Sequence, residues 1–386
     1  MHLLHGGALS GSHLTTLAFS SANGGKNVLA FGRSDGTLSL MSLNDVYVPR
    51  FELQLPAPVA CVTWKPYMTM RASRKPNTTT NAMVKTEDLV VGDEVGYIYY
   101  YVVEWPATAE ATQSGWSGTL TLLFRIHTHT QQICGLSFSG DGNMFASGGN
   151  DNLCCLYQTN LLLQSSREAL EDDRSLVTGM DGRQTHRTVE LDGVVQLSIG
   201  CEKHRWTHGA AVKAIAFCPW KEGLVATGGG SNDKCIHFFH TTSGACLATI
   251  NVTAQVTSLI WSTTRREIVA TFGYAQPDHP YRIAVFSWPD CKQVAAIPWE
   301  TDHRALYAIA YPGGPNESSV AREGGRGMSR TAAEGCIVVA SSDESVKFHE
   351  VWTSTKKATA GVEGLLGGSD ILDGMEGVDR EDEIIR

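Results

Sequence analysis

The chain has 386 residues and lacks any run of eighteen consecutive apolar residues, so the sequence predicts no membrane-spanning helix. The residues after Met1 lack the basic start and long apolar core of a secretory signal. No C-x-x-C motif occurs, and the ten cysteines are scattered, most of them in predicted strands: Cys61, Cys134, Cys218, Cys235 and Cys336. We therefore expect reduced, buried thiols in an intracellular protein.

The sequence also lacks the common catalytic motifs. None of the patterns G-x-S-x-G, H-E-x-x-H or G-x-x-x-x-G-K-S/T occurs. Gly228-Gly229-Gly230 precedes a further strand rather than a helix, so we interpret it as a crowded strand end and not as a phosphate cradle. Asp343 and Glu344 are adjacent in a turn, where their side chains diverge. The sequence therefore predicts a protein that is not an enzyme.

Metal-ligand patterns are missing as well. His127, His129, His237 and His240 have no companion cysteines or carboxylates at metal spacing, so we expect these histidines to make structural hydrogen bonds. Neither a metal nor another cofactor is predicted. The net charge of -9 at pH 7 argues against a surface built mainly for nucleic acid.

What the sequence does contain is a repeated strand pattern, clearest from His127 to Tyr157. Residues 133–139 alternate as a strand, 139–142 form a turn, 143–149 form a second strand, and 153–157 form a third. Asn150-Asp151-Asn152 is a polar turn, because Asn and Asp tolerate left-handed backbone. Three short strands cannot bury a face alone, so neighbouring copies are needed.

Five further copies supply these neighbours. They cover 13–43, 58–66 with 88–105, 208–240, 253–288, and 304–314 with 335–352. An aromatic residue ends the first strand of each copy: Phe19, Trp64, Phe138, Phe217, Trp261 and Tyr311. We call these six aromatic residues the anchors. Two of the spacings between successive anchors are about 45 residues and another is close to that value, which is the period of a four-stranded propeller blade.

These copies favour one all-β domain, a WD40 β-propeller with about six recognisable repeats, over a β-sandwich with alternating strands. We expect a flexible segment at 1–12 and the propeller over 13–352. Polar insertions interrupt it at about 68–87 and 159–204, the first a plain loop or a docking or phosphorylation site, the second with a short helix near 167–174. Residues 353–386 are Gly-rich and acidic and predict a disordered tail.

The central copies resemble the Fizzy and Fizzy-related family, the substrate-recruiting activators of the anaphase-promoting complex, a ubiquitin ligase. The segments that carry the resemblance are H-T-H-T-Q-Q-I-C-G-L-S-F-S-G-D-G at 127–142, W-T-H-G-A-A-V-K-A-I-A-F at 206–217, G-Y-A-Q at 273–276 and S-S-D-E-S-V-K-F at 341–348. The resemblance covers about 127–352, and the divergent front half is most similar to fungal meiosis-specific members. It implies seven blades.

The resemblance also implies binding of short degrons. The residues matching the family's receptor for a Lys-Glu-Asn (KEN) box are Asn150, Asp151, Asn152, Ser231, Gln255 and Arg304. Amides and a hydroxyl suit the degron Lys and Asn, and a guanidinium suits the degron Glu. Turn chemistry alone is the alternative account of Asn150 to Asn152. For a destruction box, Glu344, with its neighbour Asp343, matches the acidic partner of the degron Arg, and an exposed turn carboxylate is the alternative.

The two ends of the sequence also bear on the resemblance to this family. The sequence shows no clear first blade and no Asp-Arg-Tyr/Phe-Ile-Pro docking motif, so we expect either an N-terminally shortened product or an incomplete gene model. Family members end in Ile-Arg, as this chain does at Ile385 and Arg386. The resemblance implies that this tail docks onto a helical-repeat subunit of the ligase.

The sequence therefore predicts a non-enzymatic substrate-recognition activator of the anaphase-promoting complex, in nucleus and cytoplasm, with degron-bearing proteins as further partners and no nucleic acid or membrane. One alternative is a general WD40 scaffold for another complex. A second is a truncated paralogue that binds substrate without activating the ligase.

Overall fold

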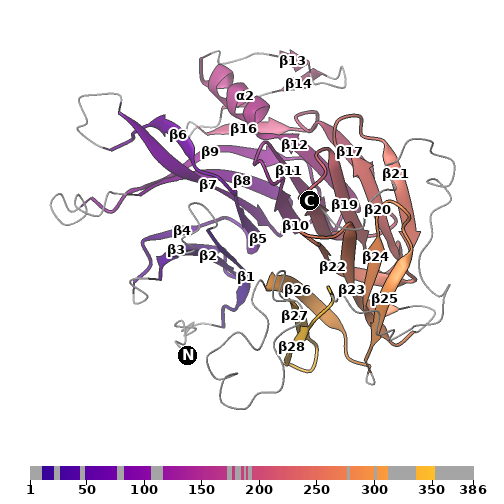
Figure 1. Cartoon of the computed structure of the whole chain (residues 1–386). Helices are drawn as coiled ribbons and strands as arrows, with labels where there is room; N and C mark the ends of the chain where they lie inside the picture. The colour runs from indigo at the N-terminus through magenta and orange to yellow at the C-terminus, as the bar shows by residue number, and fades with distance from the viewer. Residues whose placement is uncertain are drawn as a thin grey trace. The chain divides into compact units, whose positions relative to one another are not determined.

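The computed structural model describes twelve segments of the chain: residues 11–20, 27–43, 48–75, 82–105, 116–171, 176–178, 184–186, 188–189, 194–275, 279–299, 302–311 and 336–352. Nearly all regular structure in them is β-strand, as Figure 1 shows. The predicted all-β class is therefore confirmed. The chain divides into two compact units, unit 1 (Met1–Trp206) and unit 2 (Thr207–Arg386), which are described separately.

Unit 1 is built around three sets of four hydrogen-bonded strands, and the second set belongs to a larger sheet of seven strands. The first contains β1 (Leu14–Phe19), β2 (Val28–Arg33), β3 (Thr37–Ser42) and β4 (Phe51–Gln54). The second contains β5 (Val59–Trp64), β7 (Met83–Asp93), β8 (Tyr97–Glu104) and β9 (Thr119–His127). The third contains β10 (Ile133–Phe138), β11 (Met144–Gly149), β12 (Leu153–Gln158) and β17 (His204–Thr207).

Unit 2 repeats this plan three more times. The fourth sheet contains β18 (Val212–Phe217), β19 (Leu224–Gly229), β20 (Cys235–His240) and β21 (Cys246–Asn251). The fifth contains β22 (Ala254–Trp261), β23 (Glu267–Ala275), β24 (Tyr281–Ser287) and β25 (Gln293–Pro298). The sixth contains β26 (Ala305–Tyr311), β27 (Cys336–Ser341) and β28 (Val346–His349). The six predicted copies are thus six sheets.

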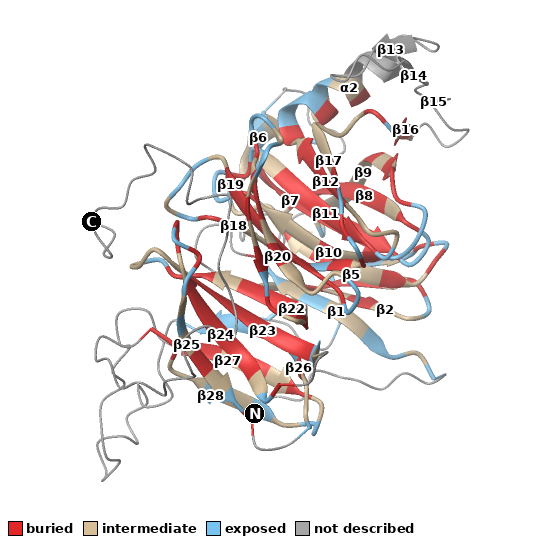
Figure 2. Cartoon of the chain, turned by 90° about the vertical axis from the view of Figure 1, so that its right-hand side faces the viewer, coloured by how far each residue is buried: buried red, intermediate tan, exposed pale blue. Residues whose placement is uncertain are grey.

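Hydrophobic clusters fill the spaces between successive sheets within each unit. One cluster joins the first and second sheets, and another joins the second and third. In unit 2, one cluster joins the fourth and fifth sheets, and another joins the fifth and sixth. Figure 2 shows that β23 and β24 are mostly buried, whereas β28 is largely not. Alternating side chains therefore pack on both faces of a central sheet, as stacked blades require.

Two of the predicted anchors occupy equivalent buried positions. The indole Nε1 of Trp64 donates to the backbone oxygen of Ala18 in the preceding sheet at 3.0 Å, and Trp261 donates to Ala216 at 3.1 Å. Phe19 and Tyr311 differ from the prediction, because they are 46% and 40% exposed. Their sheets come first and last in the described chain, and within its own unit each shares a hydrophobic cluster with one other sheet.

The two predicted insertions contain more structure than the sequence indicated. Within 68–87, β6 (Thr69–Ala72) pairs with the start of β7 and extends a hairpin, so the loop interpretation of this part is wrong. Within 159–204, helix α2 (Thr159–Glu171) begins eight residues before the predicted helix. The short strands of this segment are β13 (Leu176–Thr178), β14 (Gln184–His186), β15 (Thr188–Val189) and β16 (Val195–Ser198), the last parallel to β9.

Candidate functional site

One edge of unit 2 carries five of the eight residues predicted to bind degrons. Each first strand runs antiparallel to its second strand, so the start of the first and the end of the second share an edge. The first strands β18, β22 and β26 pack against one another in that order. We call this edge the unit 2 rim. It carries Ser231 after β19, Gln255 at the start of β22, Arg304 before β26, and the turn of Asp343 and Glu344 after β27.

Arg304 is held at the rim by an aromatic ring and by its own backbone. Its guanidinium carbon lies 4.5 Å from the ring centre of Tyr274, which is 57% exposed. The amide of Arg304 donates to Ser342 Oγ at 2.9 Å, and its carbonyl accepts from the amide of Ser342 at 3.0 Å. Cation–π contact at this distance orients the guanidinium at a partly exposed position. The sequence analysis did not select Tyr274, because its contact with Arg304 depends on the fold.

Gln255 is half-buried next to the same strand end. A Cβ placed on Gly273 would lie 2.5 Å from Gln255 Oε1, so the absence of a side chain there makes room for the amide. A Cβ on Gly228 would lie 2.4 Å from Val256 Cγ1, which places the end of β19 against β22. The structure therefore brings Gln255, Tyr274 and Arg304 together, with the exposed Ser231 on the same edge.

The two predicted acidic residues play different parts in their turn. The carboxylate of Asp343 accepts from the amide of Ser345 at 3.1 Å and pairs with Lys347 Nζ at 3.1 Å. The hydrogen bonds from Ser345 hold the pKa of Asp343 well below its usual range. Glu344 adopts a left-handed φ of 63° and is exposed. Asp343 therefore fixes the turn, and Glu344 presents its carboxylate outward.

In unit 1, the turn of Asn150, Asp151 and Asn152 joins β11 to β12. Asn150 is exposed, and its Nδ2 donates to Gln131 Oε1 at 2.9 Å. Asn152 has a φ of 66°, as the predicted polar turn requires. The carboxylate of Asp151 accepts from the amide of Thr130 at 3.0 Å. The exposed amide of Asn150 thus rests on a turn that Asp151 fixes.

A buried hydrogen-bond chain continues from Asp151 into the third sheet. His129 Nδ1 lies 3.0 Å from Asp151 Oδ1, and His129 Nε2 lies 2.7 Å from Ser147 Oγ. Burial lowers the pKa of His129, but the interactions with Asp151 and Cys155 together outweigh burial and raise the pKa to about 9. Burial raises the pKa of Asp151, yet the bond from His129 and that from the amide of Thr130 lower it overall. The structural role predicted for His129 is confirmed.

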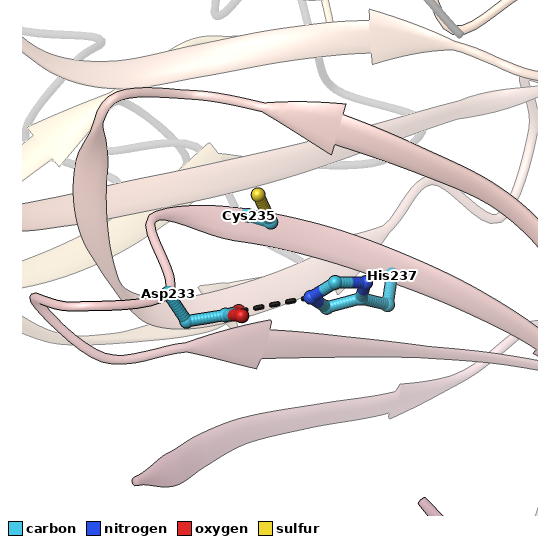
Figure 3. Close-up of side chains that lie close together, drawn as sticks. All are labelled: Asp233, Cys235 and His237. Atoms are coloured by element: carbon cyan, nitrogen blue, oxygen red, sulfur yellow. Dashed lines mark hydrogen bonds and ion pairs between the residues drawn. The ribbon is translucent and has the colours of Figure 1, made fainter. Parts of the chain in front are cut away.

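In the fourth sheet, the turn equivalent to that of Asp151 carries a pair formed by Asp233 and His237. His237 Nε2 lies 2.9 Å from Asp233 Oδ2, and Figure 3 shows the two side chains facing each other with Cys235 beside them. The prediction that His237 lacks companion carboxylates and cysteines is therefore wrong, because Asp233, Cys235 and His237 lie together. His240 follows the prediction, with Nδ1 2.8 Å from Ser243 Oγ. His127 stacks on the ring of Tyr97 at 4.2 Å.

The remaining predictions concern the termini, the cysteines and the membrane. Ile385 and Arg386 lie outside the described residues, as does the N-terminal segment 1–10. All ten cysteines are described, and none is in a disulfide. Within the segments that the structure describes, no helix is both long and apolar enough for a membrane span.

Comparison with known proteins places this geometry in a family. Residues 120–158 match the model of the WD domain, G-beta repeat, which confirms the WD40 class. An uncharacterised WD repeat-containing protein of Schizosaccharomyces pombe is 31% identical over 92% of this chain and 53% of its own length. A meiosis-specific APC/C activator protein of Saccharomyces cerevisiae is 31% identical over 74% of this chain and 39% of its own length. The meiotic fizzy-related protein 2 of Schizosaccharomyces pombe is 32% identical over 68% of this chain and 42% of its own length.

Solved structures support the fold. A chain in the crystal structure of the mitotic checkpoint complex aligns with a TM-score of 0.57 and 22% identity, covering 88% of this chain and 74% of that one. Sqt1 of Chaetomium thermophilum aligns with a TM-score of 0.54 and 15% identity, covering 88% of this chain and 73% of that one. The chain spans about half the length, or less, of the curated relatives it matches. By its repeats and its relatives, the chain belongs to the Fizzy and Fizzy-related family of WD40 proteins.

Proposed function

We propose that this chain is a substrate-recognition activator of the anaphase-promoting complex that acts by proximity and not by catalysis. The observation that carries the proposal is its similarity, over 74% and 68% of its length, to a meiosis-specific activator and to a meiotic fizzy-related protein. The unit 2 rim adds exposed groups suited to an extended peptide. In this role the protein holds a degron while another part of the chain contacts the ligase, which raises the effective concentration of substrate.

A KEN-box degron is the first proposed ligand. Arg304 supplies the cation for the degron Glu, and Tyr274 holds the guanidinium in place. Gln255 and Ser231 supply an amide and a hydroxyl for the degron Asn and Lys. In unit 1, Asn150 and Asn152 carry the amides that the family resemblance predicts for the same motif, on the turn that Asp151 fixes. The rim chemistry therefore matches the three side chains of the motif.

Fluorescence anisotropy with a labelled Lys-Glu-Asn peptide tests this ligand. We expect Arg304→Ala, Gln255→Ala and Asn150→Ala each to weaken binding about tenfold or more, or ~1.4 kcal/mol. Lys221→Ala is the matched control, because this exposed lysine lies in the β18–β19 turn at the opposite edge of its sheet. A peptide with the Glu replaced by Ala must bind weakly to the wild type. Equal binding by wild type and Arg304→Ala would refute the assignment.

A destruction-box degron is the second proposed ligand, with Glu344 as the partner of its Arg. Glu344 is exposed, whereas Asp343 is engaged by Ser345 and Lys347. We expect Glu344→Gln to weaken binding of a destruction-box peptide and to leave binding of the Lys-Glu-Asn peptide unchanged. Asp343→Asn changes turn stability as well, so Glu344→Gln is the decisive variant. Loss of both ligands in Glu344→Gln would show a folding defect instead.

Docking onto a helical-repeat subunit of the ligase is proposed for Ile385 and Arg386. A guanidinium and an apolar side chain are suited to a groove between helices. We expect a chain without these two residues to lose capture of the ligase and to retain degron binding. Capture without ubiquitination of substrate would favour the truncated paralogue. Absence of both degron binding and ligase capture would favour a general WD40 scaffold.

The proposed partners also set the proposed location. Because the ligase and its substrates belong to the cell-division machinery, we propose residence in nucleus and cytoplasm. A fluorescently tagged copy of the full chain, imaged through meiosis and mitosis, tests this proposal. Confinement of the tagged chain to a secretory compartment or a membrane would contradict it.

A further inference from the structure

Three side chains of different chemistry gather at the start of β20. Asp233 precedes the strand, and Cys235 and His237 follow at alternate positions, so the latter two share one face. One ligand atom from each lies within 4.8 Å of the other two. Lys234 adopts a left-handed φ of 59°, and the turn around it lets Asp233 reach His237. Figure 3 shows the three side chains along this one stretch of strand.

The outer atoms of this cluster are already held by neighbours. His237 Nδ1 lies 3.1 Å from Thr249 Oγ1, so the ring is oriented with Nε2 toward Asp233. Asp233 Oδ1 accepts from the amide of Gly209 at 2.9 Å, which leaves Oδ2 to face His237. Metal-ligating imidazoles and carboxylates in proteins are fixed by contacts of this kind.

The equivalent turn in the third sheet also carries an aspartate, but the strand after it carries different side chains from those of Cys235 and His237. The turn residue Asp151 corresponds to Asp233, and it pairs with His129. The two strand positions that hold Cys235 and His237 in β20 hold Leu153 and Cys155 in β12. The fourth sheet therefore carries a thiol and an imidazole on the strand itself, in addition to the ordinary turn carboxylate.

We propose that Asp233, Cys235 and His237 bind one thiophilic divalent cation of the Zn²⁺ type. A thiolate, an imidazole and a carboxylate are the ligand types that Zn²⁺ takes, at about 2.0–2.3 Å. Tetrahedral ligands at these distances lie about 3.3–3.8 Å apart. When the cation enters, Cys235 therefore approaches the other two ligands by about 1 Å, whereas Asp233 and His237, which are 2.9 Å apart without it, move slightly apart. Cation binding replaces the hydrogen bond between Asp233 and His237, and the Cys235 thiol releases its proton to solvent. A water molecule completes the fourth position.

Cobalt substitution on the full, metal-stripped chain tests the site. We expect Co²⁺ to produce a thiolate-to-cobalt charge-transfer band in the near ultraviolet and the intense visible bands of tetrahedral cobalt, and Zn²⁺ to abolish both. Cys235→Ser, a near-isosteric change, should remove the charge-transfer band. Asp233→Asn and His237→Gln should weaken cobalt binding at least about tenfold, which is ~1.4 kcal/mol.

Two matched controls make the outcome decisive. Cys61→Ser, in β5, and Cys134→Ser, in β10, should keep the band, because neither belongs to the three ligands. Circular dichroism on each variant checks that the sheets remain folded. Absence of the band in the folded wild type overturns the proposal, and so does a band that persists in Cys235→Ser or disappears in Cys61→Ser.

Discussion

Buried charge is the feature that the sequence hides best at the scale of single residues. The side chain of Asp88 is fully buried in β7, where Arg71 Nη2 donates to it at 2.9 Å and Tyr100 OH donates at 2.7 Å. Lys65 Nζ lies 3.8 Å from the same carboxylate. Strand periodicity predicts which positions are apolar, but it does not show that an Asp, an Arg and a Lys converge. This network explains why a polar, basic segment forms β6 rather than a loop.

Removing the arginine from this network should destabilise unit 1 strongly. Arg71→Met leaves a buried carboxylate without its main partner, so we expect the free energy of unfolding in urea to fall by ~3–5 kcal/mol. Lys85→Met, an exposed cation on the same hairpin, should change it by less than ~0.5 kcal/mol. The double variant Arg71→Met with Asp88→Asn should recover part of the loss. An unchanged urea midpoint in Arg71→Met would show that the pair contributes nothing.

The pair of His129 and Asp151 should make stability depend on pH. The pKa of His129 is raised from 6.5 to about 9 in the folded chain, because its interactions with Asp151 and Cys155 together outweigh burial. Its contribution is therefore fully present below pH about 6.5 and is lost as the pH rises through about 9. The lowered pKa of Asp151 adds stability above its ordinary value of 3.8, which is lost as the pH falls below it.

Urea unfolding across this range gives the measurement. Between pH about 6.5 and 9 we expect wild type to lose up to ~3 kcal/mol more than His129→Gln does. His129→Gln is less stable at every pH, so the slope and not the midpoint is the readout. Parallel curves for the two proteins would mean that His129 is not protonated in the folded state.

At the scale of elements, the sequence predicted the repeated hairpins and missed the strands that close each sheet. First, second and third strands alternate clearly and end in recognisable turns, such as Ser34-Asp35-Gly36 with its positive φ at Gly36. Fourth strands such as β4 and β17 have four residues each, too few for a periodic signal. The rim residues were predictable from the family resemblance alone. Tyr274 was missed, because its role depends on a contact with Arg304 that no spacing reveals.

Trp64 and Trp261 each donate a hydrogen bond to the preceding sheet, and substitution of either indole tests how much this bond contributes to stability. Trp261→Phe removes the donor to Ala216 and leaves a buried carbonyl without it, so we expect a loss of ~1–3 kcal/mol in the free energy of unfolding. Trp64→Phe should cost a similar amount through Ala18. Tyr67→Phe is the control, since this ring is 60% exposed. If the tryptophan variants match the control, the indole donors do not connect the sheets.

At the scale of the whole molecule, the accessibility of the cysteine thiols tests the fold, and their number tests whether any disulfide is present. All ten are free thiols; Cys246 is exposed, and the others are buried or half-buried. We therefore expect a disulfide reagent with a coloured leaving group to label one thiol rapidly in the native protein and all ten after unfolding. Cys246→Ser should remove the rapid phase and leave nine thiols after unfolding. Fewer than ten thiols in unfolded wild type would reveal a disulfide, and a rapid phase surviving in Cys246→Ser would place another cysteine at the surface.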